Sequence, residues 1–211
     1  MRKYLTEFVG TLFFVMTIAL IASRGDAMAP LVIGGALMVV VYMGGHISGA
    51  HYNCAVSLAL FLRGKLARVD LLPYIVAQLA GATVGAYLAY VVSDRSFAPA
   101  PAAGAGTMTV LLVEALYTCL LALVVLNVAT SKGTQGNSFY GLAIGFTIVI
   151  AAWAGGPISG GAFNPAVATG TIVVNVLTGS GGIGHLWLYL VGPLAGGVIG
   201  AQIYRIQEPA G

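Results

Sequence analysis

The chain has 211 residues, of which 59% are hydrophobic and 7% are charged, and its formal net charge is +3. Soluble domains carry about 25% charged residues, so this composition excludes a water-soluble domain and indicates an integral membrane protein in a lipid bilayer. The few lysines and arginines are scattered and form no basic stripe, which argues against a nucleic-acid partner. The length fits one membrane domain, residues 1–211.

Six apolar segments are interpreted as spanning helices, since a bilayer takes about 20 apolar residues to cross. These segments are Tyr4–Ala22, Leu31–Gly44, Leu71–Val92, Met108–Ala129, Phe139–Ala154 and Leu186–Tyr204. Two shorter apolar stretches, Asn53–Leu62 and Asn164–Val174, follow the second and the fifth segment. Asn is a preferred N-cap residue and Pro a preferred first helical residue, so each stretch is expected to be half a helix. The sequence predicts an all-α membrane protein with six transmembrane helices and two re-entrant half-helices.

The two half-helices begin with the same phrase. Ile47–Val56 aligns with Ile158–Val167, which keeps Ile, Ser, Gly, Asn, Ala and Val and exchanges the aromatic residue Tyr52 for Phe163. Each half of the chain therefore holds three spans and one half-helix. An odd number of spans turns the second half over in the membrane, which is the inverted repeat of many transport folds.

The repeats are expected over residues 1–93 and 107–206, joined by a linker at 94–106. Glu7 in the first span corresponds to Glu114 in the fourth, and the triplet Leu-Ala-Gly recurs in the third and sixth spans. The linker is rich in Pro, Ala and Gly. We interpret it as a flexible external connector and assign it no chemistry.

The lysines and arginines predict the orientation of the chain. Seven of them fall in the segments expected on the side of both termini: Arg2, Lys3, Arg63, Lys65, Arg68, Lys132 and Arg205. Only Arg24 and Arg95 fall on the other side. Cytoplasmic loops carry an excess of cations, so we expect a multi-pass protein of the cell membrane with both termini in the cytoplasm.

If both half-helices begin near the middle of the bilayer, their N-terminal ends meet there. Each end carries unsatisfied N–H groups and about half a unit of positive charge, so the meeting point repels cations. Asn53 and Asn164 are expected to present their amides to the lumen. A small neutral solute can exchange hydrogen bonds along such a path, whereas an ion must lose its hydration against an adverse potential.

These features resemble the aquaporin (major intrinsic protein) family over nearly the whole chain. The resemblance rests on the paired pore motifs, Asn53-Cys54-Ala55 and Asn164-Pro165-Ala166, together with Glu7, Glu114, Gln78 and Gly192-Pro193. It implies a homotetramer with one pore per subunit, passive flow of water and small neutral solutes, and rejection of protons. It also implies that Glu7 and Glu114 accept hydrogen bonds from the re-entrant loops and so brace them. No cofactor, metal or enzymatic activity is expected.

The first departure from the family pattern is Cys54, which stands where the family usually has Pro. The first turn of a helix has spare N–H donors, so the half-helix is expected to form. Two interpretations remain open: a tolerated variant of the helix start, or a thiol close enough to the pore for a mercurial to block it.

The second departure lies at the expected selectivity filter. The family usually places Arg directly after the second motif, and this chain has Val167 there. Counted from the motif asparagines as in the family, the other filter positions are Ile33, Ala152 and Gly161. None of the four side chains can donate a hydrogen bond. We expect a wider, more apolar filter that conducts water and admits glycerol, urea, ammonia or undissociated metalloid acids.

Three alternatives remain. Neighbouring side chains such as Trp153 or Phe163 could refill the filter and leave a strict water channel. An apolar constriction could also dewet, which would leave a poorly conducting membrane scaffold. An ion-coupled transporter would need titratable groups along its path, and apart from Glu7, Glu114, His46 and His51 the spans contain almost none.

Overall fold

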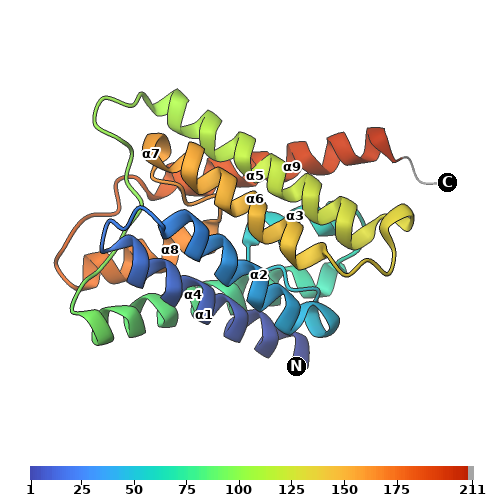
Figure 1. The fold of residues 1–211 in the computed structure, drawn as a ribbon, viewed down its shortest axis with the longest axis horizontal. Coiled ribbons are helices and arrows are strands. Elements are labelled where there is room, and N and C mark those ends of the chain that lie inside the picture. The colour runs from blue at the N-terminus through green and yellow to red at the C-terminus, as the bar shows by residue number, and fades with distance from the viewer. Residues whose placement is uncertain (209–211) are drawn as a thin grey trace.

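The computed structural model describes residues 1–208, and over these residues the chain is helical with short connections (Figure 1). The helices are α1 (Arg2–Ala22), α2 (Ala29–Ser48), α3 (Cys54–Leu62), α4 (Arg68–Ser93), α5 (Thr107–Thr130), α6 (Tyr140–Ala154), α7 (Gly156–Ser159), α8 (Pro165–Leu177) and α9 (Leu186–Gln207), with a 3-10 turn at Lys132–Thr134. Residues 209–211, at the end of the expected single domain, lie outside the described residues. The predicted all-α fold is confirmed.

The two halves of the chain interlock. Helix α1 packs against α4 in the first half, and α5 packs against α9 in the second. The half-helices cross over, since α3 contacts α9 and α8 contacts α4. Both termini lie at one end of the long axis, and the connection between α4 and α5 lies at the other end (Figure 1). This arrangement places the re-entrant segments between the repeats, where they are enclosed by longer helices.

Five helices, α1, α2, α4, α5 and α9, are long and apolar enough to cross a membrane. The expected fifth span, Phe139–Ala154, corresponds to α6, which has 15 residues, and α7 follows it after a break at Gly155. Pro157 explains the break, since proline lacks the N–H that would bond to the carbonyl four residues earlier. The equivalent helix of the first repeat, α2, has His46 at that position and runs unbroken for 20 residues.

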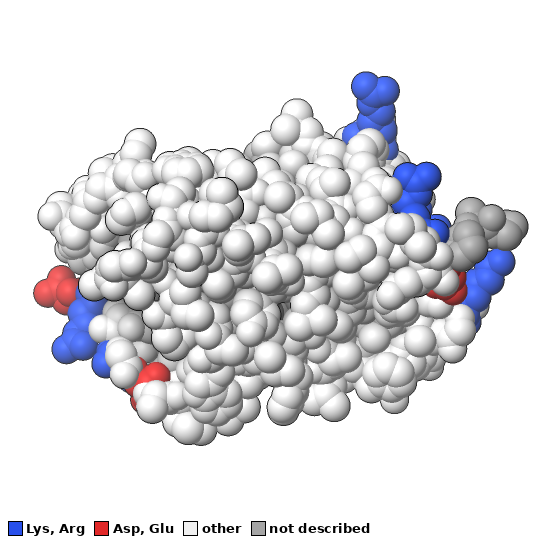
Figure 2. Space-filling model, turned by 90° about the horizontal axis from the view of Figure 1, so that it is seen from above, with Lys and Arg blue, Asp and Glu red and all other residues white. Residues whose placement is uncertain are grey.

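The charged side chains gather at the two ends of the long axis, and the face in Figure 2 shows none between them. The side chains of the spanning helices that face outward are large and apolar, for example Phe13, Val39 and Leu116. An uncharged apolar belt between two charged ends is the surface that a bilayer requires. Together with the long apolar helices it identifies a multi-pass membrane protein.

Equivalent glycines allow the closest helix contacts in both repeats. A Cβ atom on Gly81 of α4 would overlap the carbonyl oxygen of Phe8, and one on Gly196 of α9 would overlap that of Ala115. Small residues at such crossings let helix backbones approach closely in membranes. The two pairs occupy matching positions, so the repeat seen in the sequence is also a repeat in helix packing.

The linker at residues 94–106 is attached to the second repeat at several points, which differs from the expected loose connector. The Asn175 amide donates to the Ser96 hydroxyl at 3.0 Å, and the Ala102 N–H donates to the Ile158 carbonyl at 3.1 Å. The side chain of Pro99 is buried. The composition of the linker concealed these contacts, because two of the groups involved are backbone atoms.

Candidate functional site

The two motif asparagines cap the half-helices as the sequence predicts. Asn53 Oδ1 accepts from the N–H groups of Ala55 at 2.8 Å and Val56 at 3.4 Å, at the start of α3. Asn164 Oδ1 accepts from the N–H of Ala166 at 2.9 Å, at the start of α8. Both asparagines have an extended backbone, as an N-cap residue normally does. Replacing Pro by Cys at position 54 therefore leaves the first half-helix intact.

The same two side chains join the half-helices to each other. Asn53 Nδ2 donates to the Phe163 carbonyl at 2.9 Å, and Asn164 Nδ2 donates to the Tyr52 carbonyl at 2.8 Å. An amide nitrogen carries two hydrogens, so each asparagine keeps one for the lumen. The reciprocal bonds hold the two helix N-termini together in the interior of the protein, as expected from the inverted repeat.

The re-entrant loops before the half-helices share an unusual backbone. Tyr52 and Phe163 have φ angles of 46° and 49°, and the residues two positions earlier, Ala50 and Gly161, have φ angles of 50° and 68°. A residue other than glycine in this left-handed region costs about 1–3 kcal/mol, and such strain persists only where surrounding contacts hold it. The contacts that hold it here come from two carboxylates.

Glu7, on α1, is fully buried and accepts four hydrogen bonds. Its Oε1 accepts from the Ser48 hydroxyl at 2.7 Å and the His51 N–H at 3.0 Å. Its Oε2 accepts from the Tyr52 N–H at 2.8 Å and from Gln78 Nε2 at 2.8 Å. One carboxylate thus holds both ends of the first re-entrant loop and ties it to α4.

Glu114, on α5, repeats this arrangement in the second half. Its Oε1 accepts from the Ser159 hydroxyl at 2.7 Å and the Ala162 N–H at 3.0 Å, and its Oε2 accepts from the Phe163 N–H at 2.6 Å. The second repeat has no equivalent of the Gln78 bond, because Pro193 stands in that place. Within residues 1–208 neither carboxylate forms an ion pair, so the contacts favour a bracing role over ion coupling.

Two tyrosine hydroxyls that the sequence reasoning missed hold the same loops. Tyr74 on α4 donates to the Ser48 carbonyl at 2.7 Å, and Tyr189 on α9 donates to the Ser159 carbonyl. The tyrosines are 115 positions apart, as are Gly81 and Gly196. This shared spacing places both tyrosines at the same position of the repeat, so the sequence could have indicated that they have the same role.

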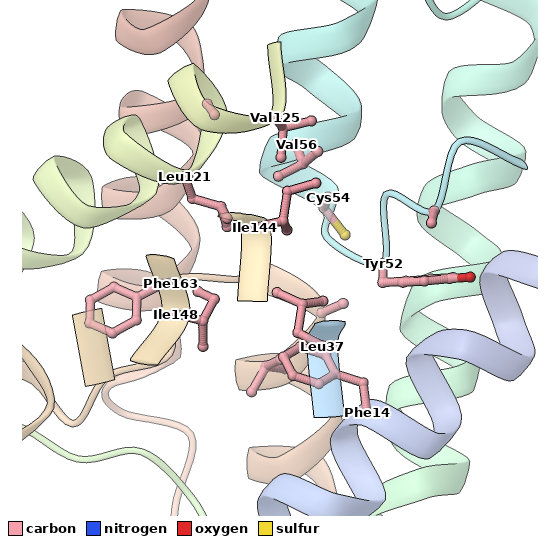
Figure 3. Packing of buried hydrophobic residues seen from close by; sticks show 14 of the residues in the cluster. Phe14, Leu37, Tyr52, Cys54, Val56, Leu121, Val125, Ile144, Ile148 and Phe163 are labelled. Atoms are coloured by element: carbon pink, nitrogen blue, oxygen red, sulfur yellow. The ribbon is translucent and has the colours of Figure 1, made fainter. Parts of the chain in front are cut away.

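A narrow cavity of about 40 Å³ runs between the helices beside the two half-helix ends. One side is formed by the re-entrant loops, Ala50–Asn53 and Gly161–Asn164, and the other by apolar side chains of five helices, α1, α2, α3, α5 and α6. Figure 3 shows several of the latter, including Phe14, Leu37, Leu121, Ile144 and Ile148. One water needs about 10–15 Å³ by this measure, so the cavity holds about three.

A wider vestibule of about 820 Å³ opens at the end that carries the termini. Lys3, Lys65 and Asp70 line it, and Lys3 donates to the Asp70 carboxylate at 2.6 Å. His51 and Ile144 line both the vestibule and the narrow cavity. The vestibule and the narrow cavity therefore adjoin the same two residues, on the side of the half-helix ends that faces the termini.

The expected filter positions do not all lie on the cavity wall. Ile33, Ala152 and Gly161 line the cavity. Val167 is only 2% exposed, belongs to the hydrophobic core and is absent from the wall. Cys54 is also buried behind the wall, at 4% exposure, which favours the tolerated helix start over a thiol that blocks the pore. The remaining motif residues, Ala55, Pro165 and Ala166, are buried and support the asparagines.

Comparison with known proteins agrees with this geometry. The family model described as major intrinsic protein matches residues 1–204. The glycerol uptake facilitator protein-like 6 of Lactiplantibacillus plantarum is 34% identical over 221 residues, covering 98% of each chain. Aquaporin Z of Rhodopseudomonas palustris is 32% identical over 230 residues, covering 99% of this chain and 94% of its own. The crystal structure of the aquaglyceroporin from Plasmodium falciparum superimposes with a TM-score of 0.87 at 24% identity, covering 96% of this chain and 94% of its own, and shows the same fold.

Proposed function

This chain belongs to the major intrinsic protein family, whose relatives include aquaporins and glycerol facilitators, and we propose that it conducts small uncharged solutes larger than water as well as water itself. Glycerol, urea, ammonia and undissociated metalloid acids are the solutes that this proposal includes. In this proposal the filter comprises Ile33, Ala152 and Gly161 on the cavity wall, while Val167, the fourth expected position, is buried off the wall. The path between the half-helices is the passive pore.

One observation carries the proposal. The filter positions on the cavity wall are Ile33, Ala152 and Gly161, and none of these side chains can donate a hydrogen bond or carry a charge. A strict water filter needs a narrow opening and donors that replace the lost hydration of a single water. An opening lined by a methyl group, a glycine and an aliphatic chain instead offers contact to the carbon skeleton of a polyol.

The re-entrant loops supply the polar half of the same path. Their carbonyl groups can accept from solute hydroxyls, and the second amide hydrogen of Asn53 or Asn164 can donate to solute oxygens. The paired helix N-termini carry partial positive charge, which opposes cations and protons. Neutral solutes that both donate and accept hydrogen bonds fit this combination better than any ion.

A strict water channel is the second candidate, because the cavity of about 40 Å³ is narrow. Of the side chains expected to refill the filter, Trp153 is 51% exposed and absent from the cavity wall. Phe163 does lie on the wall, with its ring packed against Tyr117 at 5.6 Å between centroids. The size of the opening beside Gly161 therefore decides between the two candidates.

The test is a stopped-flow measurement on proteoliposomes exposed to a glycerol gradient, in which shrinkage reports water flow and reswelling reports glycerol flow. The informative variant is Ala152→Leu, which adds an isopropyl group at the cavity wall. Its matched control is Ala154→Leu, the same change on the outer face of α6. Steric fit at the scale of one methylene changes selectivity by about 10–200-fold, so we expect A152L to lower glycerol permeability at least about tenfold and A154L to leave it unchanged.

The wild-type result separates the candidates. Rapid shrinkage and rapid reswelling relative to empty liposomes support the solute channel. Rapid shrinkage with reswelling no faster than in empty liposomes makes the protein a strict water channel and refutes the proposal. Absence of both fluxes favours the poorly conducting scaffold.

We also propose that the protein is a homotetramer in the cell membrane with both termini cytoplasmic. The excess of lysines and arginines at the end of the molecule that carries the termini supports this orientation. Protease protection in inverted vesicles tests the orientation, and mass measurement of the detergent-solubilised protein tests the assembly.

A further inference from the structure

The two re-entrant loops share their backbone but have different surroundings. Gly49 and Gly160 occupy equivalent positions, with φ angles of 86° and 92°. A Cβ atom on Gly49 would approach only the side chain of His51, at 3.1 Å. A Cβ atom on Gly160 would lie 2.5 Å from the Ala100 carbonyl oxygen and 2.6 Å from its nitrogen. The linker therefore lies directly against the second loop, and among residues 1–208 no equivalent segment covers the first.

The linker is bonded to the residues that lead into the filter. The Ala102 N–H donates to the Ile158 carbonyl, two residues before Gly160 and three before Gly161. On the other side of the contact with Gly160, Ser96 accepts from Asn175, near the end of α8. The contact between Ala100 and Gly160 thus lies between two hydrogen bonds that attach the linker to the second repeat.

Apolar packing supports the same contact. Ala98 and Ala105 of the linker pack on a small core that contains Ala162, Ala168 and Tyr189. Ala162 belongs to the re-entrant loop, and Tyr189 holds that loop through Ser159. The linker and the loop therefore share a core that is separate from the main core of the protein.

Gly161 lies between two sets of restraints. From inside, Glu114 holds the flanking residues Ser159 and Ala162. From outside, the linker holds Ile158 and Gly160. Gly161 has no side chain, so its contribution to the opening depends only on where its backbone lies, and a shift of the linker changes the opening directly.

We propose that residues 98–102 of the linker are a specificity-determining brace, which positions the backbone of Gly160 and Gly161 and so sets the largest solute that the filter admits. The brace acts on one mouth only, which agrees with the narrow filter at this end and the wide vestibule at the other. This inference rests on the proposed function, in that it assigns the size limit for neutral solutes to a particular segment.

The test removes one hydrogen bond of the brace. Ala102→Pro deletes the N–H that bonds to Ile158. The matched control is Ala103→Pro. Residues 102–105 form a turn in which the Ala105 N–H bonds to the Ala102 carbonyl. Ala103 is the second residue of this turn, a position where proline is favoured. A second variant, P99G/P101G, loosens the linker on both sides of Ala100 without removing a donor to Ile158.

Two readouts are measured on each variant. One is amide hydrogen exchange of the peptide that covers residues 158–163, which we expect to be at least about tenfold faster in A102P and P99G/P101G, because local opening sets the exchange rate. The other is the permeability to ethylene glycol, glycerol and erythritol relative to water, which we expect to rise most for the largest solute. A103P should match the wild type in both.

The exchange and permeability results together decide whether the linker sets the size limit of the filter. Unchanged exchange in both brace variants overturns the inference, whatever the fluxes. Faster exchange without a shift in relative permeability overturns the specificity role. If the wild type admits no polyol, the proposed function fails by itself, and the inference then stands only if A102P admits ethylene glycol or glycerol while A103P does not.

Discussion

Replacing either buried glutamate by glutamine should leave one backbone donor of its re-entrant loop without an acceptor. Glutamine has one acceptor oxygen and one amide nitrogen that only donates. In Glu114→Gln the best placement turns the amide towards the single donor at Oε2, the Phe163 N–H. In Glu7→Gln the better placement turns the amide towards the Ser48 hydroxyl and the His51 N–H. The hydroxyl can rotate and accept from the amide, so the His51 N–H is the one backbone donor that loses its acceptor.

The loss in stability follows from these counts. A buried donor left without an acceptor costs about 1–3 kcal/mol, and 1 kcal/mol shifts the melting temperature by about 2–4 °C for a chain of this size. Taking the middle of both ranges, E114Q and E7Q should each melt about 6 °C lower than the wild type.

The assay is thermal unfolding in detergent, followed through the fluorescence of Trp153 and Trp187. Asp94→Asn serves as the control, because Asp94 is exposed and caps α4 in a left-handed conformation that asparagine also tolerates. A melting temperature equal to that of the wild type in E7Q or in E114Q would refute the bracing argument. An ion-coupling role predicts instead that fluxes become insensitive to ion gradients while stability is kept.

Three further predictions concern the pore motifs. Cys54→Pro should fold and raise the melting temperature by about 1–4 °C, because proline suits the first helical position and restricts the unfolded chain by about 0.4–1 kcal/mol. A mercurial should leave wild-type flux unchanged, since Cys54 is buried behind the wall, and inhibition that disappears in Cys54→Ala would contradict this. Asn53→Ala and Asn164→Ala should each lower the melting temperature by about 4–10 °C through loss of a cap and of the bond to the opposite loop. The double variant should lose less than the sum, because either change loosens the same junction; strictly additive losses would show that the two bonds act independently.

The parts of the fold that the sequence predicted well are those with a local signal present twice. An asparagine before a short apolar run identifies a capped half-helix by itself, and a second copy 111 residues later identifies the repeat. Glu7 and Glu114 were recognised for the same reason, and the structure shows them accepting bonds from equivalent atoms. Hydropathy ended the fifth span at Ala154, where α6 ends, and Pro157 is a visible signal of the break at Gly155.

The parts that could not be predicted depend on angles between elements. The bonds from Asn53 to Phe163 and from Asn164 to Tyr52 need both loops in place before either partner is evident. Val167 occupies the motif position that the filter argument selected, yet it is buried and is not among the residues that line the narrow cavity. Position in a motif identifies a residue of the half-helix, but only the packing of that helix decides which way the side chain points.

An inverted repeat by itself makes a pore with two equivalent ends, so the selectivity of this protein has to come from the places where the repeats differ. The path beside the first loop carries His51, which also lines the vestibule, whereas the equivalent Ala162 lies in a core shared with the linker. Gln78 adds a fourth bond to Glu7, whereas Pro193 adds none to Glu114. The second loop therefore has fewer internal bonds and gains an external brace, and its position, unlike that of the first, can be altered by changes far from the pore motif.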